Sequence, residues 1–313
     1  MPPNRPSSNA DSAPPLLDDC QLERSSVVAN ARMNRTRGLH GIDSYQRELG
    51  IDPLVLLEAV SKPGLGATAR LPSSEKFDTA LLDQLAVAPD VGSMLVLKPL
   101  LGERQDQAAT ARWLDLCCGS GLALIEAARC WQPAAGRPGQ LSLHGVDLIA
   151  MFAEVPAGLG AVTFEAASLA RWQTPRRYDL ITCVHGLHYL GDKLGLIERA
   201  ITWLTPGGVF LANLDVASLR RDDGKPLGRR LLAKFRAGGF DYDRRAHVLS
   251  RTGNATFSFG LRYVGADDQA GANYTGQEAV DSYYGKLNRP TCALSNPIAA
   301  TASKLTSGSA PAA

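Results

Sequence analysis

The sequence lacks the features that mark several classes of protein. No hydrophobic run in its 313 residues approaches the length of a membrane-spanning helix. Residues 1–8 are polar and rich in proline and serine, without the apolar core of a signal peptide. We therefore expect a cytoplasmic protein with neither a secretory leader nor a membrane anchor.

Cysteine pairs and one-sided charge are also missing. The six cysteines are scattered, with Cys117 and Cys118 adjacent and no C-x-x-C pair, so we expect reduced thiols. A formal net charge of +2 argues against the concentrated basic face that nucleic-acid binding requires. What is present is an ordinary apolar content of 45%, enough for one large α/β domain with appendages.

The most informative segment is residues 113–121. A short apolar run ends in an acid, two cysteines and a Gly-Ser-Gly turn, and residues 122–129 then read as a helix. Strand, tight glycine turn and helix open a nucleotide-type α/β unit. Glycine is needed there because the turn takes backbone angles that a Cβ obstructs, and because the backbone must approach a ligand closely.

Further strands follow at the spacing of such a fold. Apolar runs that read as strands occupy residues 141–147, 161–166, 178–184 and 204–213. The last of these begins with a Leu-Thr-Pro-Gly-Gly turn. Residues 245–249 and 256–264 read as two more strands. Their connection is too short for a crossover helix, so we expect them to pair antiparallel.

The remaining segments are read as appendages. We expect residues 1–20 to be disordered, 21–107 to form a helical N-terminal lid and 108–266 to form the core. Residues 267–313 are expected to be an extension whose tail is disordered from about 286. The predicted lid carries three arginines, Arg32, Arg35 and Arg37. One of them could bind a carboxylate of the cofactor or substrate, or all three could lie on a solvated helix face.

Together these landmarks resemble class I S-adenosylmethionine-dependent methyltransferases. Cys117 stands where that family often carries its first glycine. The resemblance implies a seven-stranded, mostly parallel Rossmann-like sheet with an antiparallel last strand. It also implies S-adenosylmethionine as the cofactor and an O or N atom of a small or medium-sized metabolite as the methyl acceptor.

The resemblance also implies a cofactor site. Asp147 ends a strand at the spacing expected of a ribose-binding carboxylate, and Leu148 is expected to cover the adenine. Ser168 falls where the family usually places an acid near the adenine amino group, so either Ser168 or the backbone of Leu169 could make that contact. The predicted cofactor-binding residues are Asp115, Cys117, Gly119, Gly121, Asp147, Leu148, Ser168, Leu169 and Val184.

His185 is the candidate catalytic residue. It follows the strand at 178–184, and its imidazole could deprotonate the acceptor or could only line the pocket. His188 is expected to pack at a helix start. A metal site at these two histidines is disfavoured because few carboxylates or cysteines lie near them in sequence.

Two other functions stay open on the residues alone. A Rossmann-type NAD(P)-dependent oxidoreductase is disfavoured because Leu124 occupies the place of its third glycine. A catalytically silent cofactor-binding protein is the other alternative, since this fold needs no invariant catalytic side chain.

Overall fold

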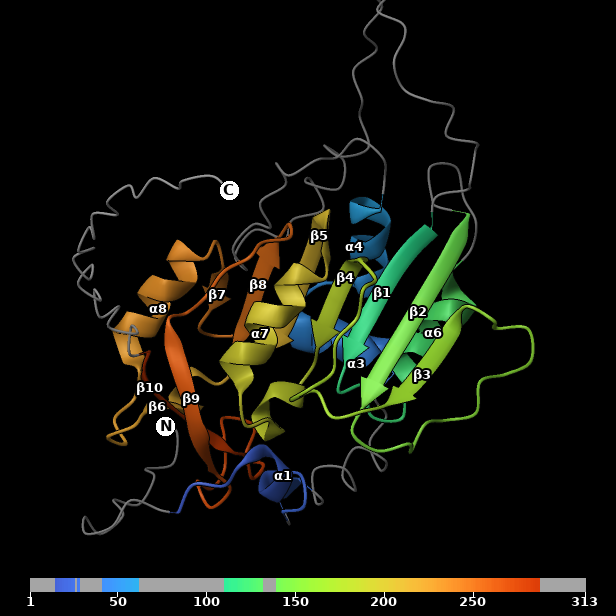
Figure 1. Cartoon of the computed structure of the whole chain (residues 1–313). Helices are drawn as coiled ribbons and strands as arrows, with labels where there is room; N and C mark the ends of the chain where they lie inside the picture. Colours follow the sequence, from blue (N-terminus) through green and yellow to red (C-terminus); the bar gives the residue numbers. More distant parts are fainter. Residues whose placement is uncertain (1–14, 26, 29–40, 62–109, 132–138, 288–313) are drawn as a thin grey trace, which may run out of the picture.

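The computed structural model describes residues 15–25, 27–28, 41–61, 110–131 and 139–287. Its centre is a seven-stranded sheet with the order β3-β2-β1-β4-β5-β8-β7 (Figure 1). The first five strands in that order run parallel, and β8 runs antiparallel to both of its neighbours. The predicted sheet is thereby confirmed. Its strands are β1 (Thr110–Leu116), β2 (Gln140–Asp147), β3 (Val162–Ala166), β4 (Tyr178–Cys183), β5 (Leu204–Asn213), β7 (Asp241–Asp243) and β8 (Val248–Thr252).

The sheet is buried on both faces. Along β5, Val209 and Leu211 belong to one apolar cluster, whereas Phe210 and Ala212 belong to the other, because successive side chains of a strand point to opposite faces. The helices form a layer over each cluster (Figure 1). One layer holds α3 (Ile42–Leu49), α4 (Pro53–Val60) and α6 (Leu122–Cys130), and the other holds α7 (Lys193–Thr202) and α8 (Gly228–Ala237).

The helices α3 and α4 are part of the core. Gly41 and Gly50 bound α3, and Gly50 ends it with a φ of 72°, which glycine adopts without strain. Pro53 begins α4, where its missing N–H costs nothing. Tyr45 and Leu57 are buried against the sheet. This part of the predicted lid therefore covers a face of the sheet and does not lie above the strand ends.

The first described residues also belong to the fold. Leu17 exchanges backbone hydrogen bonds of 2.8 and 2.9 Å with Ala266, and α1 (Asp19–Leu22) follows with Leu22 buried. Residues 15–20 therefore correct the prediction of disorder over 1–20, because their backbone pairs with a strand from the far end of the chain. Residues 1–14 lie outside the described residues.

A second, three-stranded sheet has the order β6-β10-β9. Its strands are β6 (Leu219–Arg221), β9 (Leu261–Asp267) and β10 (Asp281–Lys286). The predicted pairing of the strands near 245–249 and 256–264 is wrong, because β8 joins the large sheet and β9 the small one. The intervening residues Phe257 and Phe259 pack against Phe240 beside α8 and carry the chain from one sheet to the other.

Several expectations fall on residues that the structure does not describe. They are residues 62–109, which hold most of the predicted lid, the three N-terminal arginines Arg32, Arg35 and Arg37, and the tail from 288 onwards. Within the described ranges, no helix has the length and apolar character needed to cross a membrane.

Candidate active site

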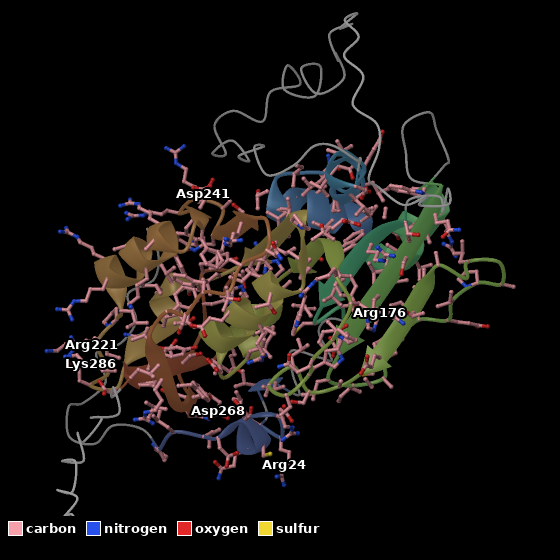
Figure 2. The ribbon with its side chains drawn as sticks, turned by 45° about the horizontal axis from the view of Figure 1, so that its top comes forward. Arg24, Arg176, Arg221, Asp241, Asp268 and Lys286 are labelled. Atoms are coloured by element: carbon pink, nitrogen blue, oxygen red, sulfur yellow. The ribbon has the colours of Figure 1, made fainter. Side chains whose placement is uncertain are left out.

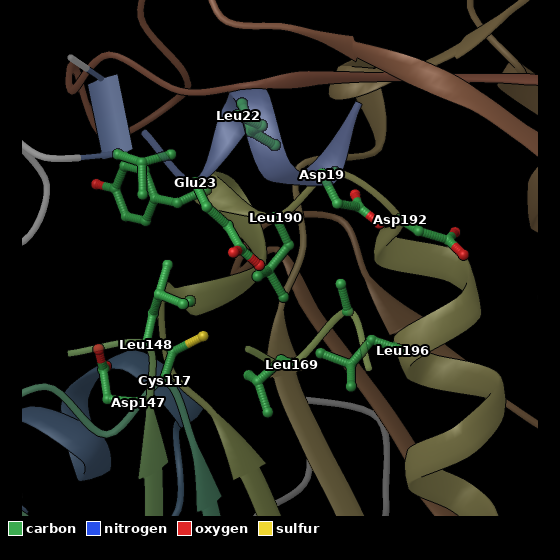
Figure 3. Close-up of a pocket in the computed structure, with 15 residues that line it drawn as sticks. Asp19, Leu22, Glu23, Cys117, Asp147, Leu148, Leu169, Leu190, Asp192 and Leu196 are labelled. Atoms are coloured by element: carbon green, nitrogen blue, oxygen red, sulfur yellow. The ribbon is translucent and has the colours of Figure 1, made fainter. Parts of the chain in front are cut away.

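A pocket lies at the carboxyl ends of β1 and β2, beneath α1 (Figure 3). This is the edge at which open α/β sheets bind their ligands. Leu148 and Leu169 line it where the chain leaves β2 and β3, and Leu190 and Leu196 line it from the segment between β4 and the first turns of α7. The pocket thus has apolar walls and lies beside the glycine turn that follows β1.

The turn after β1 is built in the left-handed region. Gly119 and Gly121 have φ angles of 60° and 75°, and a Cβ at Gly121 would overlap the ring of Phe164. Cys117, which lines the pocket, has a φ of 57°, which costs a non-glycine residue about 1–2 kcal/mol. This backbone conformation is one that glycine would adopt without that cost.

Asp147 connects the end of β2 to this turn. Its carboxylate accepts a hydrogen bond of 2.9 Å from the backbone N–H of Gly119 and a longer one of 3.4 Å from Ile149. Asp147 is largely buried and lines the pocket (Figure 3). The same carboxylate can therefore hold the turn and face a ligand.

Other predicted binding residues lie elsewhere. Asp115 is fully buried, and its carboxylate accepts hydrogen bonds of 2.6 Å from both Tyr45 and Thr182. It thus fastens α3 to β1 and β4 and does not line the pocket. Val184 packs in the apolar cluster beneath α4. Ser168 donates a hydrogen bond to Glu23 of the α1 segment.

The structure therefore divides the predicted cofactor residues. Four of them line the pocket: Cys117, Asp147, Leu148 and Leu169. The sequence analysis missed Gly186, where a Cβ would overlap Cys117, as well as Leu190 and Leu196. It also missed the α1 segment, which is too short to show helical periodicity.

His185 lies just beyond β4 in a cluster of polar groups. Its φ of 55° is again left-handed, and its Nε2 lies 3.1 Å from Oε2 of Glu48 on α3. Its Nδ1 lies 3.5 Å from Nε2 of His188. Asn213, at the end of β5, accepts a hydrogen bond from the His185 backbone N–H and donates one to the Glu48 carbonyl. We call Glu48, His185, His188, Asn213 and Tyr274 the histidine cluster.

Tyr274 completes this cluster from a distant part of the chain. Its ring stacks on His247 with centroids 3.8 Å apart and meets the His188 ring edge-on at 5.4 Å. Burial, with the nearby charge of Glu48, raises the pKa of Tyr274. Its phenol thus stays neutral at physiological pH. In the part of the chain that the structure describes, no three potential metal ligands gather.

Comparison with known proteins identifies this architecture. Residues 94–249 match the family model of a methyltransferase domain. That half of the chain is a class I S-adenosylmethionine-dependent methyltransferase domain. The predicted resemblance is thereby confirmed, and the glycine turn, the β2 acid and the antiparallel β8 are its landmarks in this chain.

Curated relatives of this methyltransferase domain are known. A trans-aconitate 2-methyltransferase of Pseudomonas paraeruginosa is 33% identical over 110 residues, which cover 35% of this chain and 38% of that protein. The protein of the same name from Pseudomonas aeruginosa (strain UCBPP-PA14) is 35% identical over 104 residues, 33% of this chain and 35% of the relative. The chain thus matches little more than a third of the length of these relatives.

Solved methyltransferases are similar to the domain as well. One is a structure with bound S-adenosylmethionine of an amino pentose methyltransferase from Micromonospora echinaspora, with 25% identity over 33% of this chain and 42% of that one. Its TM-score is 0.27, too low for the likeness to carry weight.

The pocket suits the cofactor of this family. Four of its lining residues carry carboxylates, Asp19, Glu23, Asp147 and Asp192, and no lysine or arginine occurs among the lining residues that the structure describes. S-adenosylmethionine carries a sulfonium and an ammonium against one carboxylate, so its net charge is positive. A pyrophosphate-bearing dinucleotide would instead be repelled by such a lining.

Proposed function

We propose that the protein transfers the methyl group of S-adenosylmethionine to an oxygen or nitrogen atom of a small molecule. The observation that carries this proposal is the acidic and apolar pocket at the ends of β1 and β2. It suits a cationic nucleoside and disfavours NAD(P), the main alternative. The bound cofactor supplies an electrophilic methyl group, and the protein's own residues hold both reactants and take up a proton.

The cofactor half of the site follows from the lining. Asp147 accepts hydrogen bonds from the ribose hydroxyls, and Leu148 and Leu169 flank the base. The left-handed turn at Gly119 and Gly121 brings backbone N–H groups toward the amino-acid end of the cofactor. Asp115 acts from behind this surface, because its bonds to Tyr45 and Thr182 fix the end of β1.

The histidine cluster provides the proton acceptor. A proton taken by the imidazole of His185 converts it to an imidazolium, which the Glu48 carboxylate at 3.1 Å stabilises. Asn213 holds His185 and Glu48 close together through its hydrogen bonds to the backbone of each. His185 is thus the proposed general base, and Glu48 and Asn213 are positioning residues.

The acceptor is proposed from the setting of the cluster. The two curated relatives are named for trans-aconitate, a small carboxylic acid, which supports a small-molecule acceptor with a nucleophilic oxygen. We therefore place the acceptor between the pocket and the histidine cluster, where the segment from His185 to Leu190 borders both.

Calorimetric titration of the full chain with S-adenosylhomocysteine and, separately, NADH tests the cofactor. We expect micromolar binding of the first and none of the second, and the reverse order would reject the proposal. Transfer of labelled methyl groups to a panel of small carboxylic acids, phenols and amines then tests the reaction. Labelling of no panel member, alongside tight S-adenosylhomocysteine binding, would indicate a catalytically silent binder.

A further inference from the structure

Four lining residues of the pocket come from outside the methyltransferase domain: Asp19, Leu22, Glu23 and Val28. Glu23 follows α1, and its side chain points into the pocket toward the strand ends that carry Leu148 (Figure 3). Its neighbour Arg24 is exposed and points away from the molecule (Figure 2). The two opposite charges therefore diverge, and only the carboxylate is directed at the ligand site.

Glu23 is held in this position by the large sheet's own loop. Ser168, two residues after β3, donates its hydroxyl hydrogen to Oε1 of Glu23. The next residue, Leu169, is buried and lines the pocket, and Arg199 donates a hydrogen bond of 2.7 Å to its carbonyl. A carboxylate accepts hydrogen bonds at several lone-pair sites.

The α1 segment is itself firmly attached. Leu17 pairs with Ala266 of β9, and Leu22 lies in a buried cluster with Val280. Glu23 is thus fixed at two points, from the second sheet through α1 and from the large sheet through Ser168. A carboxylate placed so rigidly can select a ligand by hydrogen bonding and not only by charge.

Asp19 and Asp192, the acids that α1 and the start of α7 contribute to the pocket lining, have other partners. Asp19 faces Tyr263 and Asp192, and burial together with Asp192 raises its pKa. Asp192 caps α7 by accepting a hydrogen bond of 2.9 Å from Gly195. Glu23 alone of the three bonds to the loop that carries Leu169, the proposed wall of the base site.

We propose that Glu23 accepts a hydrogen bond from the exocyclic amino group of adenine, and that the α1 segment is the cover of the adenine end of the pocket. This rests on the proposed function. An amino-bearing purine offers N–H donors to a carboxylate, whereas a purine with a carbonyl at that position sets two acceptors against each other. Ser168, in the loop after β3, is then a positioning residue for an acid supplied by the α1 segment.

The test compares S-adenosylhomocysteine with its hypoxanthine analogue, in which a carbonyl oxygen replaces the amino group. Calorimetry on the full-length wild type should show the adenine form binding roughly 10- to 100-fold more tightly, the usual value of a hydrogen bond to a charged group. Glu23→Gln should lose most of that preference, because its amide can donate to the carbonyl oxygen. Ser168→Ala should reduce the preference in part.

Asp19→Asn is the matched control, since it removes one carboxylate from the same helix and the same pocket. It should change the affinity for both ligands by the same factor and leave their ratio intact. A folded Glu23→Gln protein with the wild-type ratio would overturn the inference about Glu23. A wild type that binds neither ligand would instead overturn the proposed function, so the two failures are distinguishable.

Discussion

The two halves of the site are built in different ways. In the proposed cofactor half, the glycine turn directly follows β1, and Asp147 and Leu148 stand together where β2 ends, so each of these features is encoded in one short segment. The histidine cluster draws its groups from α3, the loop after β4, the end of β5 and the segment at Tyr274. The turn and acid of the proposed cofactor half can thus be encoded by local motifs, whereas the proposed acceptor half is assembled from distant segments.

The N-terminal segment contributes to both halves. Glu23 reaches the cofactor pocket from α1, and Glu48 reaches His185 from α3. Two residues of the segment expected to form one lid therefore have separate positions, Glu23 above the strand ends and Glu48 on a helix that covers a face of the sheet. The following substitutions test whether the two halves are also separate in function.

The largest effect is expected in the cofactor half, from Gly119→Val. A β-branched residue is strongly disfavoured at a φ of 60°, so the turn should rearrange and S-adenosylhomocysteine binding should fall below detection. Gly160→Val is the control, because it has no positive φ and a Cβ there meets nothing within 4 Å. Calorimetry on the folded variants decides, and wild-type affinity in Gly119→Val would refute the assignment of the turn.

His185→Asn should impair the histidine cluster and leave the proposed cofactor half unchanged. Loss of a general base lowers turnover by roughly 10²- to 10⁴-fold, whereas affinity for S-adenosylhomocysteine should stay within about twofold. Glu48→Gln should lower turnover less, since the imidazole remains. Methyl-transfer kinetics with the best acceptor of the panel measure this. Equal losses of binding and turnover in His185→Asn would show that the halves are not independent.

Asp147→Asn should weaken binding of S-adenosylmethionine and S-adenosylhomocysteine alike, because both carry the same ribose. We expect a loss of about 1.5–3 kcal/mol in binding free energy, the range for hydrogen bonds to a charged group. Asp147→Ala should lower the binding free energy further, because it also removes the acceptor for the Gly119 N–H. If the two variants bind equally well, the contact between β2 and the turn contributes nothing to the site.

The smallest effect concerns the loop that both halves share. Lys193 is fully buried and donates hydrogen bonds of 2.7–2.9 Å to Ser282, Val280 and Leu190, which joins this loop to β10. Burial lowers the pKa of Lys193 from 10.5 to about 7. Between these values the unfolded chain binds more protons than the folded one, so this group makes stability rise with pH through that window.

Lys193→Met should remove this contribution. From pH 7 to pH 9 the wild type should gain about 1–3 kcal/mol more unfolding free energy than the variant. Urea titrations followed by tryptophan fluorescence at the two pH values measure the difference. Parallel pH dependences in the two proteins would mean that the lowered pKa of Lys193 does not contribute to the pH dependence of stability.

The sequence by itself determined the large sheet, together with the turn and the acid of the proposed cofactor half. Alternating or continuous apolar residues and the glycine turn act over a few neighbouring positions, so the sequence could predict that Cys117, Asp147, Leu148 and Leu169 lie at one site, and all four line the pocket. The buried role of Asp115 could not, because it depends on Tyr45, 70 positions earlier in the chain.

Tertiary structure alone decided the rest. In the second sheet, β6 pairs with β10, some 60 residues later in the chain, and no local sequence pattern predicts that pairing. Glu23 and Ser168 meet across 145 positions, and Glu48 meets His185 only because α3 packs on the sheet. Short-range patterns fix which segments become strands and turns, since backbone conformation is set by neighbouring residues. Which side chains converge on a ligand is set by packing, since burial of apolar faces brings distant segments together.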